Sequence, residues 1–247
     1  MHLEEFAEGT SVFHRLDPRV KIVTLLPYII VVAVMNEITY PAIALFISIL
    51  MIIITRIDTK KLLNRMAVVN TFILLLWFFL PFSYPGNKVF SIGSLTATQA
   101  GFLFALSITL KANAIVLATI AILGTSEVFS LAHALVHMKM PRKLVYLFFF
   151  FYRYISVLHE EYTTLKRAIN VRAFRPKTTM HTYKTYAYLV GMLIVRSYDH
   201  SQRIYSAMLC RGFTGKFPII THFHMHTRDY VFSVFMLSVT ITMVVLS

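Results

Sequence analysis

Charged residues and cysteine are scarce in this sequence of 247 residues. Only 14% of its residues are charged and 57% are hydrophobic, whereas about a quarter of the residues in an ordinary soluble domain are charged. Such a chain has too little polar surface for a soluble globular protein, and we expect an integral membrane protein. Its single cysteine, Cys210, excludes an intrachain disulfide.

Motifs for nucleotide binding and for hydrolysis are missing as well. The eight glycines include no phosphate-binding loop of the GxxxxGKS or GxxxxGKT type, so we do not expect the chain itself to bind ATP. Neither HExxH nor GxSxG occurs. Carboxylates are nearly absent from the apolar segments, which argues against a proton-coupled carrier with an acidic relay. We therefore expect a chain that is not itself an enzyme.

Five apolar segments are predicted to cross the membrane as helices. They cover about residues 20–35, 38–55, 66–82, 98–123 and 230–247. Asp17 and Pro18 are expected to start the first helix, because aspartate is a preferred N-cap and proline suits the first helical position.

The distribution of lysine and arginine predicts the orientation in the membrane. Residues 56–65 contain four cations, and residues 125–228 contain 15 of the 24 in the chain. Cation-rich connections stay in the cytoplasm, so we place the N-terminus in the cytoplasm and the chain in the inner (plasma) membrane. The same rule accounts for the formal charge of +13, and nucleic-acid binding is not expected.

The cation-rich part of the chain is predicted to form three further helices at the cytoplasmic face. Two of its uncharged apolar stretches, 144–152 and 185–195, are shorter than the roughly 20 residues that a spanning helix needs. We expect helices over about 126–139, 142–173 and 179–211, the first of them capped by Thr125 or Ser126.

The predicted class is an all-α integral membrane protein with about five transmembrane helices and three interfacial or cytoplasmic coupling helices. We divide the chain into transmembrane helices (1–124), a cytoplasmic coupling domain (125–227) and a last transmembrane helix (228–247). A wide aromatic face in the coupling domain is expected to pack under the membrane helices or against a partner subunit. It consists of Phe148, Phe149, Phe150 and Phe151.

Two of the coupling helices are predicted to end alike. The pattern A-x-x-x-R-x-F occurs at residues 168–174 and again at 207–213, an offset of 39. Gly212 is expected to stop the later helix, because glycine enters the left-handed conformation without steric cost. Arg211 then lies in the last turn, where a cation suits the negative end of the helix dipole. Each helix would present a guanidinium to an acidic or carbonyl-lined groove.

Two polar features within or beside the apolar segments could carry chemistry. Lys111 lies inside the fourth spanning segment, where a charge suggests function by default, although snorkelling or pairing with a neighbouring carbonyl is favoured here. His222, His224 and His226 alternate in a loop. They could share one metal only if the backbone is extended, and a solvated loop is the favoured interpretation.

Several of these segments resemble the T component of energy-coupling-factor transporters, specifically the cobalt/nickel type (CbiQ/NikQ). The resemblance covers most of the chain, including residues 16–21 (LDPRVK), 152–154 (YRY) and 207–215 (AMLCRGFTG). Family members carry two Ala-Arg-Gly signatures at the ends of two coupling helices. Here these read VRA at 171–173 and CRG at 210–212.

The resemblance implies how such a chain works. The residues at the two helix ends would couple to ATPases, and the aromatic face at 148–151 would pack on another membrane subunit. The coupling residues are Arg172, Ala173, Phe174, Cys210, Arg211, Gly212 and Phe213. Each arginine tip would dock on one of two cytoplasmic ATP-binding-cassette subunits. Their closure would be transmitted to a separate metal-binding membrane subunit, the S component, with room for a small accessory membrane subunit beside it.

The resemblance also implies where the ligands belong. This chain would bind no cofactor and would contact membrane lipid. ATP and Mg would be held by the partner ATPases, and Co(II) or Ni(II) by the S component. The expected process is ATP-driven import of cobalt or nickel, the former for cobalamin biosynthesis, and the sequence does not choose between the two ions.

Two other functions stay open from the sequence. The first is a membrane anchor or assembly scaffold that takes no part in transport. The second is an intramembrane enzyme that uses Lys111 and the histidine-rich loop. A coupling subunit should respond to the ATPase activity of its partners, and an anchor should not.

Overall fold

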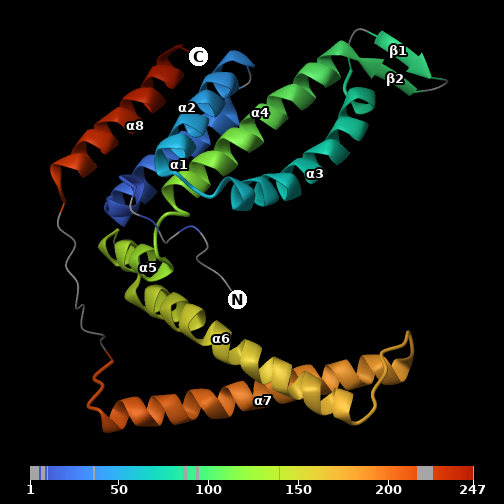
Figure 1. Cartoon of the computed structure of the whole chain (residues 1–247), viewed down its shortest axis with the longest axis vertical. Coiled ribbons are helices and arrows are strands. Elements are labelled where there is room, and N and C mark those ends of the chain that lie inside the picture. The colour runs from blue at the N-terminus through green and yellow to red at the C-terminus, as the bar shows by residue number, and fades with distance from the viewer. Residues whose placement is uncertain are drawn as a thin grey trace. The chain divides into compact units, whose positions relative to one another are not determined.

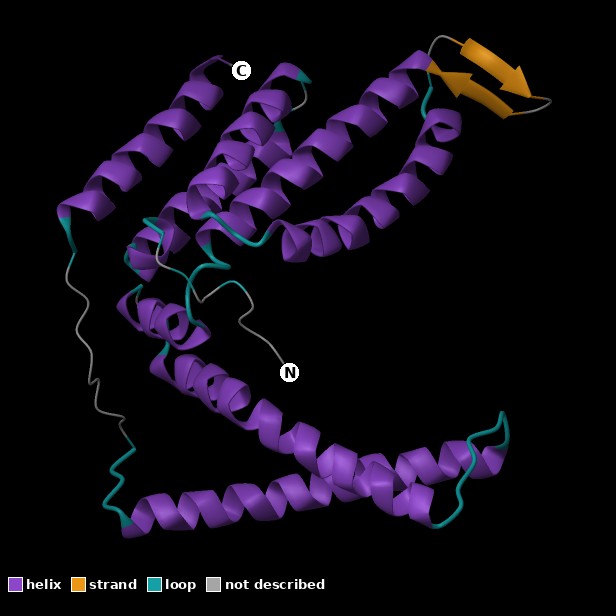
Figure 2. Ribbon diagram, in the orientation of Figure 1, coloured by secondary structure: helices purple, strands orange, loops and turns teal. Residues whose placement is uncertain are grey.

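The computed structural model describes residues 6, 9, 11–35, 37–85, 88–92, 95–138, 140–215 and 225–246 (Figures 1 and 2). The chain divides into two compact units, one of residues 2–139 with 223–247 and one of residues 140–222. We call the first the membrane unit and the second the coupling unit, and describe each by itself.

All five predicted membrane segments are helical. In the membrane unit a short 3-10 helix (Phe13–Arg15) is followed by α1 (Pro18–Val34), α2 (Thr39–Thr55), α3 (Thr59–Ser83), α4 (Gln99–Ile122), α5 (Val128–His137) and α8 (Thr227–Leu246). Three of them, α3, α4 and α8, are long and apolar enough to cross a membrane, while α1 and α2 have 17 residues each. The predicted class of helical membrane protein is confirmed; the number of five crossings stays a prediction.

Helix α4 forms the centre of the membrane unit, with α2 and α3 packed along it and α1 packed against both α4 and α8 (Figure 1). Fully buried alanines such as Ala44 and Ala114 let the helices approach closely. The Tyr28 hydroxyl of α1 donates to the Ala44 carbonyl of α2 at 2.8 Å, and the Ser48 hydroxyl of α2 donates to the Ala114 carbonyl of α4 at 2.9 Å. These bonds connect three helices in the core.

The predicted start of the first helix is confirmed. Asp17 is the N-cap of α1, its carboxylate accepts a hydrogen bond from the Arg19 amide at 2.8 Å, and Pro18 is the first helical residue. Helix α3 begins at Thr59, inside the cation-rich connection, earlier than predicted. The Asp58 side chain caps this start by accepting from the Lys60 amide at 3.0 Å, and helix propensity continues the helix into the apolar residues.

One element was not predicted at all. The connection between α3 and α4, which lies between two of the predicted membrane segments, contains two antiparallel strands, β1 (Lys88–Ile92) and β2 (Leu95–Thr98). The β-branched residues of these short strands suit an extended backbone. The Thr98 hydroxyl then accepts from the Gly101 amide at 3.2 Å and begins α4.

The coupling unit consists of two long helices, α6 (Arg142–Val171) and α7 (Met180–Cys210), that cross each other (Figure 1). Their bounds agree with the predicted helices over 142–173 and 179–211. By compactness, α5 belongs to the membrane unit. The functional division predicted after residues 124 and 227 stays a prediction.

Candidate functional site: two arginine-tipped helices

The crossed pair of α6 and α7 places its two helix ends far apart. The helices have 30 and 31 residues, so each is about 45 Å long at 1.5 Å per residue. They run in opposite directions, and their C-terminal ends lie at opposite ends of the pair (Figure 1). Where they meet, the Arg196 guanidinium of α7 lies 2.9 Å from the Glu161 carboxylate of α6.

Both helices end in the same hydrogen-bonded cap. At the end of α6, the Phe174 amide donates to the Ile169 carbonyl at 3.4 Å and the Ala173 amide to the Asn170 carbonyl at 3.0 Å. At the end of α7, 39 residues later, the equivalent amides make the equivalent bonds: Phe213 to Met208 at 3.1 Å and Gly212 to Leu209 at 2.9 Å. These two bonds define a Schellman motif.

The left-handed residue of each cap is the one that the sequence repeat aligns. Gly212 has φ +77° and Ala173 has φ +57°. Alanine therefore takes the conformation that glycine takes in the second tip, although its Cβ makes that conformation less favourable by about 1–2 kcal/mol. The change from glycine to alanine in the first signature has kept the cap geometry.

The arginines of the two tips are more exposed than the phenylalanines. Arg172 and Arg211 are exposed, and neither side chain has a hydrogen bond or ion pair within the part of the chain that the structure describes. Their neighbours Val171 and Cys210 are exposed too. Each tip thus presents an unpaired guanidinium on an exposed helix end.

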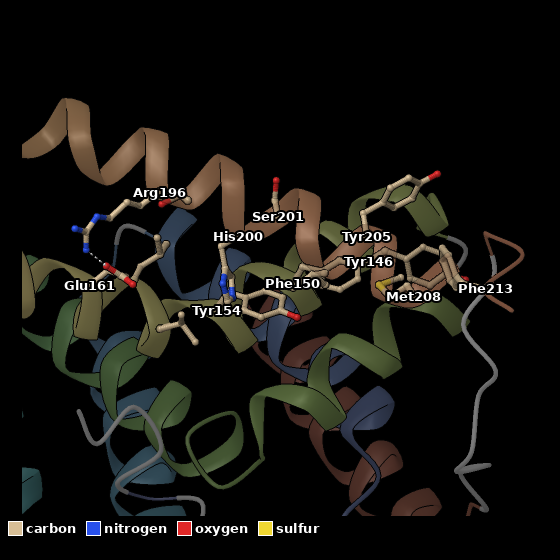
Figure 3. A pocket seen from close by; sticks show the side chains of 14 residues that line it. Tyr146, Phe150, Tyr154, Glu161, Arg196, His200, Ser201, Tyr205, Met208 and Phe213 are labelled. Carbon is tan, nitrogen blue, oxygen red and sulfur yellow. Dashed lines mark hydrogen bonds and ion pairs between the residues drawn. The ribbon is translucent and has the colours of Figure 1, made fainter. Parts of the chain in front are cut away.

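The phenylalanine of each tip, by contrast, turns inward. The Phe174 ring lies 5.9 Å from the ring of Tyr186 and 6.2 Å from that of His181, both in α7. The Phe213 ring borders a groove between α6 and α7 that Tyr146 of α6 also lines (Figure 3). The end of α6 is therefore braced by ring contacts with α7, and Phe213 at the end of α7 lines the groove that α6 also lines.

The caps permit a direct test of the tip geometry. We expect Gly212→Ala to destabilise the end of α7 by about 1–2 kcal/mol, because open space surrounds the position and the left-handed backbone alone disfavours a Cβ. The reverse change, Ala173→Gly, should stabilise the end of α6 by up to about 1 kcal/mol after the greater freedom of glycine in the unfolded chain is subtracted. Amide hydrogen exchange at residues 173–174 and 212–213 measures both effects. Faster exchange in Ala173→Gly would contradict the described cap.

The groove at the crossing has a volume of about 500 Å³ and is mostly apolar (Figure 3). The rings of Tyr154 and His200 meet edge to face within it at 5.8 Å. Rings and aliphatic side chains from both helices line it, with a few polar groups near the Glu161–Arg196 pair. The apolar lining includes Tyr146, Phe150, Val157, Leu158, Ile204, Met208 and Phe213.

The four consecutive phenylalanines do not form the single wide face that we predicted. Phe150 lines the groove, whereas Phe148 and Phe151 are 40% and 61% exposed. Successive residues of an α-helix point about 100° apart, so four in a row surround the helix. Phe149, partly buried, contacts the ring of Phe150.

A second polar cluster, in the membrane unit, was not found from the sequence. Lys21 is fully buried, and its ammonium group donates to the Ser126 hydroxyl at 2.5 Å and to the Thr125 hydroxyl at 3.1 Å. The buried Asp229 carboxylate accepts from the Asp17 amide at 2.9 Å and from the His226 amide at 2.8 Å. The start of α1 is thereby connected to the α4–α5 turn and to the start of α8.

This cluster corrects the predicted cap of α5. The N-cap position is Glu127, and no side chain caps the helix there. Thr125 and Ser126 instead accept hydrogen bonds from Lys21. A buried ammonium group requires such partners, and this requirement outweighed the local preference for a hydroxyl cap. The signal in the sequence was the single cation within the first apolar segment.

The two lesser candidates have different outcomes. Lys111 donates to the Ala33 carbonyl in the last turn of α1 at 3.1 Å, so the favoured pairing with a neighbouring carbonyl is confirmed. His222 and His224 lie outside the described residues. Within the part that the structure describes, no group of three histidine, cysteine or acidic side chains is placed to hold a metal ion.

Comparison with known proteins then decides the family. The CbiQ family, described as "Cobalt transport protein", matches residues 9–223, which include both arginine tips and Lys21. The chain belongs to the CbiQ family. It is also similar to individual transporter proteins at modest identity, in two of the three cases below over most of its length.

Three of these CbiQ-like relatives illustrate the range. The energy-coupling factor transporter transmembrane protein EcfT of Bacillus subtilis is 26% identical over 87% of this chain and 85% of the relative. The EcfT of Streptococcus equi subsp. equi is 25% identical over 86% and 83%. The nickel permease LarQ of Lactiplantibacillus plantarum is 32% identical over 32% and 28%. The chain is thus a membrane subunit of a transporter family.

Proposed function

We propose that this chain is the transmembrane coupling subunit, or T component, of an ATP-driven energy-coupling-factor importer for cobalt or nickel. The observation that carries the proposal is the pair of equivalent tips, each with an exposed, unpaired arginine above a Schellman cap. A chain with two equivalent docking ends suits two equivalent partners. The EcfT relatives named above support the transporter class.

The partners at the tips are two cytoplasmic ATP-binding-cassette subunits, which bind ATP and Mg. A guanidinium forms paired hydrogen bonds with a carboxylate or with carbonyl oxygens, which makes arginine suited to a buried contact at an interface. Because the tips lie at opposite ends of the crossed helices (Figure 1), each ATPase engages one tip without contacting the other. The tips then follow the two ATPases when these close on ATP.

The contacts at the crossing support relative motion of the two helices. Its ion pair joins two side chains that are 45% and 42% exposed, and such exposed pairs contribute only about 0–1 kcal/mol. Closure of the ATPases would pivot α6 against α7 and change the groove between them. Movement of the tips is thereby transmitted to the partner subunit that covers the crossed pair of α6 and α7.

The surface of the coupling helices supports a membrane partner. Large apolar side chains are exposed along them, among them Leu147, Tyr188 and Ile194 at 65%, 75% and 64%. An apolar surface of this extent marks a protein or membrane contact. We assign it to a metal-binding S component, with Co(II) or Ni(II) held in that subunit. The cation-rich coupling unit and the N-terminus are cytoplasmic, as positive residues indicate.

Affinity capture tests the proposal. The tagged chain is isolated from native membranes in mild detergent, its partners are identified by mass spectrometry, and uptake of radioactive cobalt or nickel is measured in vesicles with and without ATP. ATP-binding-cassette subunits, a small membrane protein and ATP-dependent uptake are expected. Capture of no ATPase, with uptake indifferent to ATP, would favour the anchor or scaffold instead.

The histidine-rich loop should be dispensable for this function. We expect the triple change of His222, His224 and His226 to alanine to leave metal uptake close to that of the wild type, because the cargo is bound by another subunit. Uptake in the same vesicles measures the effect. A large loss at low metal concentration, reversed at high concentration, would instead show that this loop binds the metal.

A further inference from the structure

Helices α2 and α8 border a wedge-shaped groove that no described residue of the membrane unit fills. The groove has a volume of about 580 Å³. Its lining comes from the second half of α2 and the first half of α8, with Phe13 and Val12 at one end. The remaining apolar side chains are Leu16, Phe46, Ile47, Leu50, Met51, Ile54, Val231, Phe232 and Phe235.

The groove is open to its surroundings and closes toward one end of the helices. Met51 and Phe13 are 2% and 5% exposed at its floor, whereas Phe46 and Val231 at its rims are 68% and 65% exposed. Toward the far end, the Tyr40 hydroxyl at the start of α2 donates to the Leu246 carbonyl at the end of α8. The two helices are joined there and lie farther apart at the end of α2 (Figure 1).

Cations surround the wide end. Arg228 in the first turn of α8 lines the groove itself. Val12 and Ile54 line both the groove and an adjoining polar pocket of about 610 Å³, which is also lined by Arg56 and Lys61.

These cations have no counter-charge in the described chain. The side chains of Arg56, Lys61 and Arg228 are all exposed, and none forms a hydrogen bond or ion pair with a described residue. Among the described residues that line the polar pocket, the one acid, Asp58, accepts from the Lys60 amide and caps α3. Among the described residues, positive charge therefore predominates at this end of the apolar groove.

We propose that this groove binds one phospholipid with an anionic headgroup. An acyl chain fills the space between Leu50 and Val231, and the phosphate lies among Arg228, Arg56 and Lys61. The arrangement matches an amphiphile from end to end: apolar walls along the helices, then cations at the wide end. This end carries the cation-rich connection of residues 56–65, which positive charge places at the cytoplasmic surface, where anionic lipids are attracted to basic residues.

The proposed lipid has a structural consequence. Among the described elements, helix α8 packs chiefly on α1, and its first half borders the groove with Val231, Phe232 and Phe235. Phe13, edge to face with Phe232 at 5.4 Å, closes the floor. A bound acyl chain would take the place of a missing helix and fix the angle between α2 and α8. This inference does not depend on the coupling function.

Native mass spectrometry of the tagged full chain, isolated in mild detergent with the subunits that accompany it, tests the site. The probe is phosphatidylglycerol, with phosphatidylcholine for comparison, added to delipidated protein. We expect one phosphatidylglycerol to stay on this chain and phosphatidylcholine to be lost. Arg228→Gln should weaken retention about fivefold, as expected when one basic residue near an anionic surface is removed. Leu50→Trp should fill the groove and also lower retention.

Matched variants separate the site from general lipid contact. Arg167→Gln removes an exposed cation from α6, and Leu75→Trp enlarges a side chain on α3 that is 54% exposed, close to the 45% of Leu50. Both should retain the lipid as the wild type does, and circular dichroism should show all four variants folded. Equal retention in all variants, or equal retention of both lipids, overturns the proposal. Loss of a partner protein instead of lipid from Leu50→Trp would assign the groove to that protein and overturn it too.

Discussion

The double variant Arg172→Glu/Arg211→Glu is expected to lose ATP-driven metal uptake and both ATPases while the chain stays folded in the membrane. Each arginine is exposed and has no partner among the described residues, so its replacement removes only the helix-dipole interaction, about 0.3–1 kcal/mol, from the fold. In the docked state it would face carboxylates or carbonyls of an ATPase. Removing one partner of such a buried charge pair costs about 2–5 kcal/mol, or roughly 30-fold and more in affinity. Reversing the charge adds repulsion to this loss.

Each single variant should release one of the two ATPases. Since the tips lie at opposite ends of the crossed helices (Figure 1), Arg172→Glu should release the ATPase at the end of α6 and keep the other. Arg211→Glu should do the converse. Native mass spectrometry of the captured assembly counts the ATPases, with two expected in the wild type, one in each single variant and none in the double variant. Uptake should fall strongly in all three, because one ATPase alone cannot form a closed pair.

A matched charge reversal makes the experiment specific. Arg167→Glu changes an exposed arginine of the same helix, one turn and a half before the tip, and should keep both ATPases and normal uptake. If the double variant takes up metal at the wild-type rate, the tips do not couple the ATPases to metal uptake. If Arg167→Glu is as defective as Arg172→Glu, the effect belongs to the net charge of the helix, and the role assigned to the tips is wrong.

The tips could be predicted from the sequence because their information is local. A Schellman cap involves six consecutive residues, and the repeat at an offset of 39 marked the same positions twice. The family resemblance did not indicate which cap would end α6 without a glycine at residue 173. The φ of +57° at Ala173 supplies that answer. Which way the arginine and the phenylalanine of each tip point depends on α6 crossing α7, and no periodicity in either helix contains that information.

The membrane unit shows the opposite case. Its helices were predicted from apolar length alone, but their connections were not. The paired strands β1 and β2 lie in the connection between α3 and α4. Helix α3 starts seven residues before its predicted apolar segment. Lys21 and Thr125 are 104 residues apart in the chain, so their contact is a property of helix packing. A cation within an apolar segment indicates that a partner exists, without indicating which one.

That buried cation gives the second large expected effect, a loss of stability in Lys21→Met. The side chain is fully buried, bonded to two hydroxyls, and near the carboxylates of Asp17 and Asp229, with which it interacts electrostatically. Methionine has a similar length but removes a buried cation from beside both carboxylates, although Arg19 stays 4.0 Å from that of Asp17. Removing one member of a buried charged group costs about 3–5 kcal/mol. The start of α1, the α4–α5 turn and the start of α8 should all loosen.

Lys111→Met is the matched control, since it removes a lysine from the interior of another membrane helix, α4. Lys111 makes one hydrogen bond, to the Ala33 carbonyl, and is only partly buried. Its loss should cost less, about 1.5 kcal/mol, in the range of one charged hydrogen bond. Thermal unfolding of the purified chain, followed by circular dichroism, ranks the wild type, Lys111→Met and Lys21→Met in order of falling midpoint. Equal midpoints for Lys21→Met and the wild type would show that the cluster does not hold the three segments together.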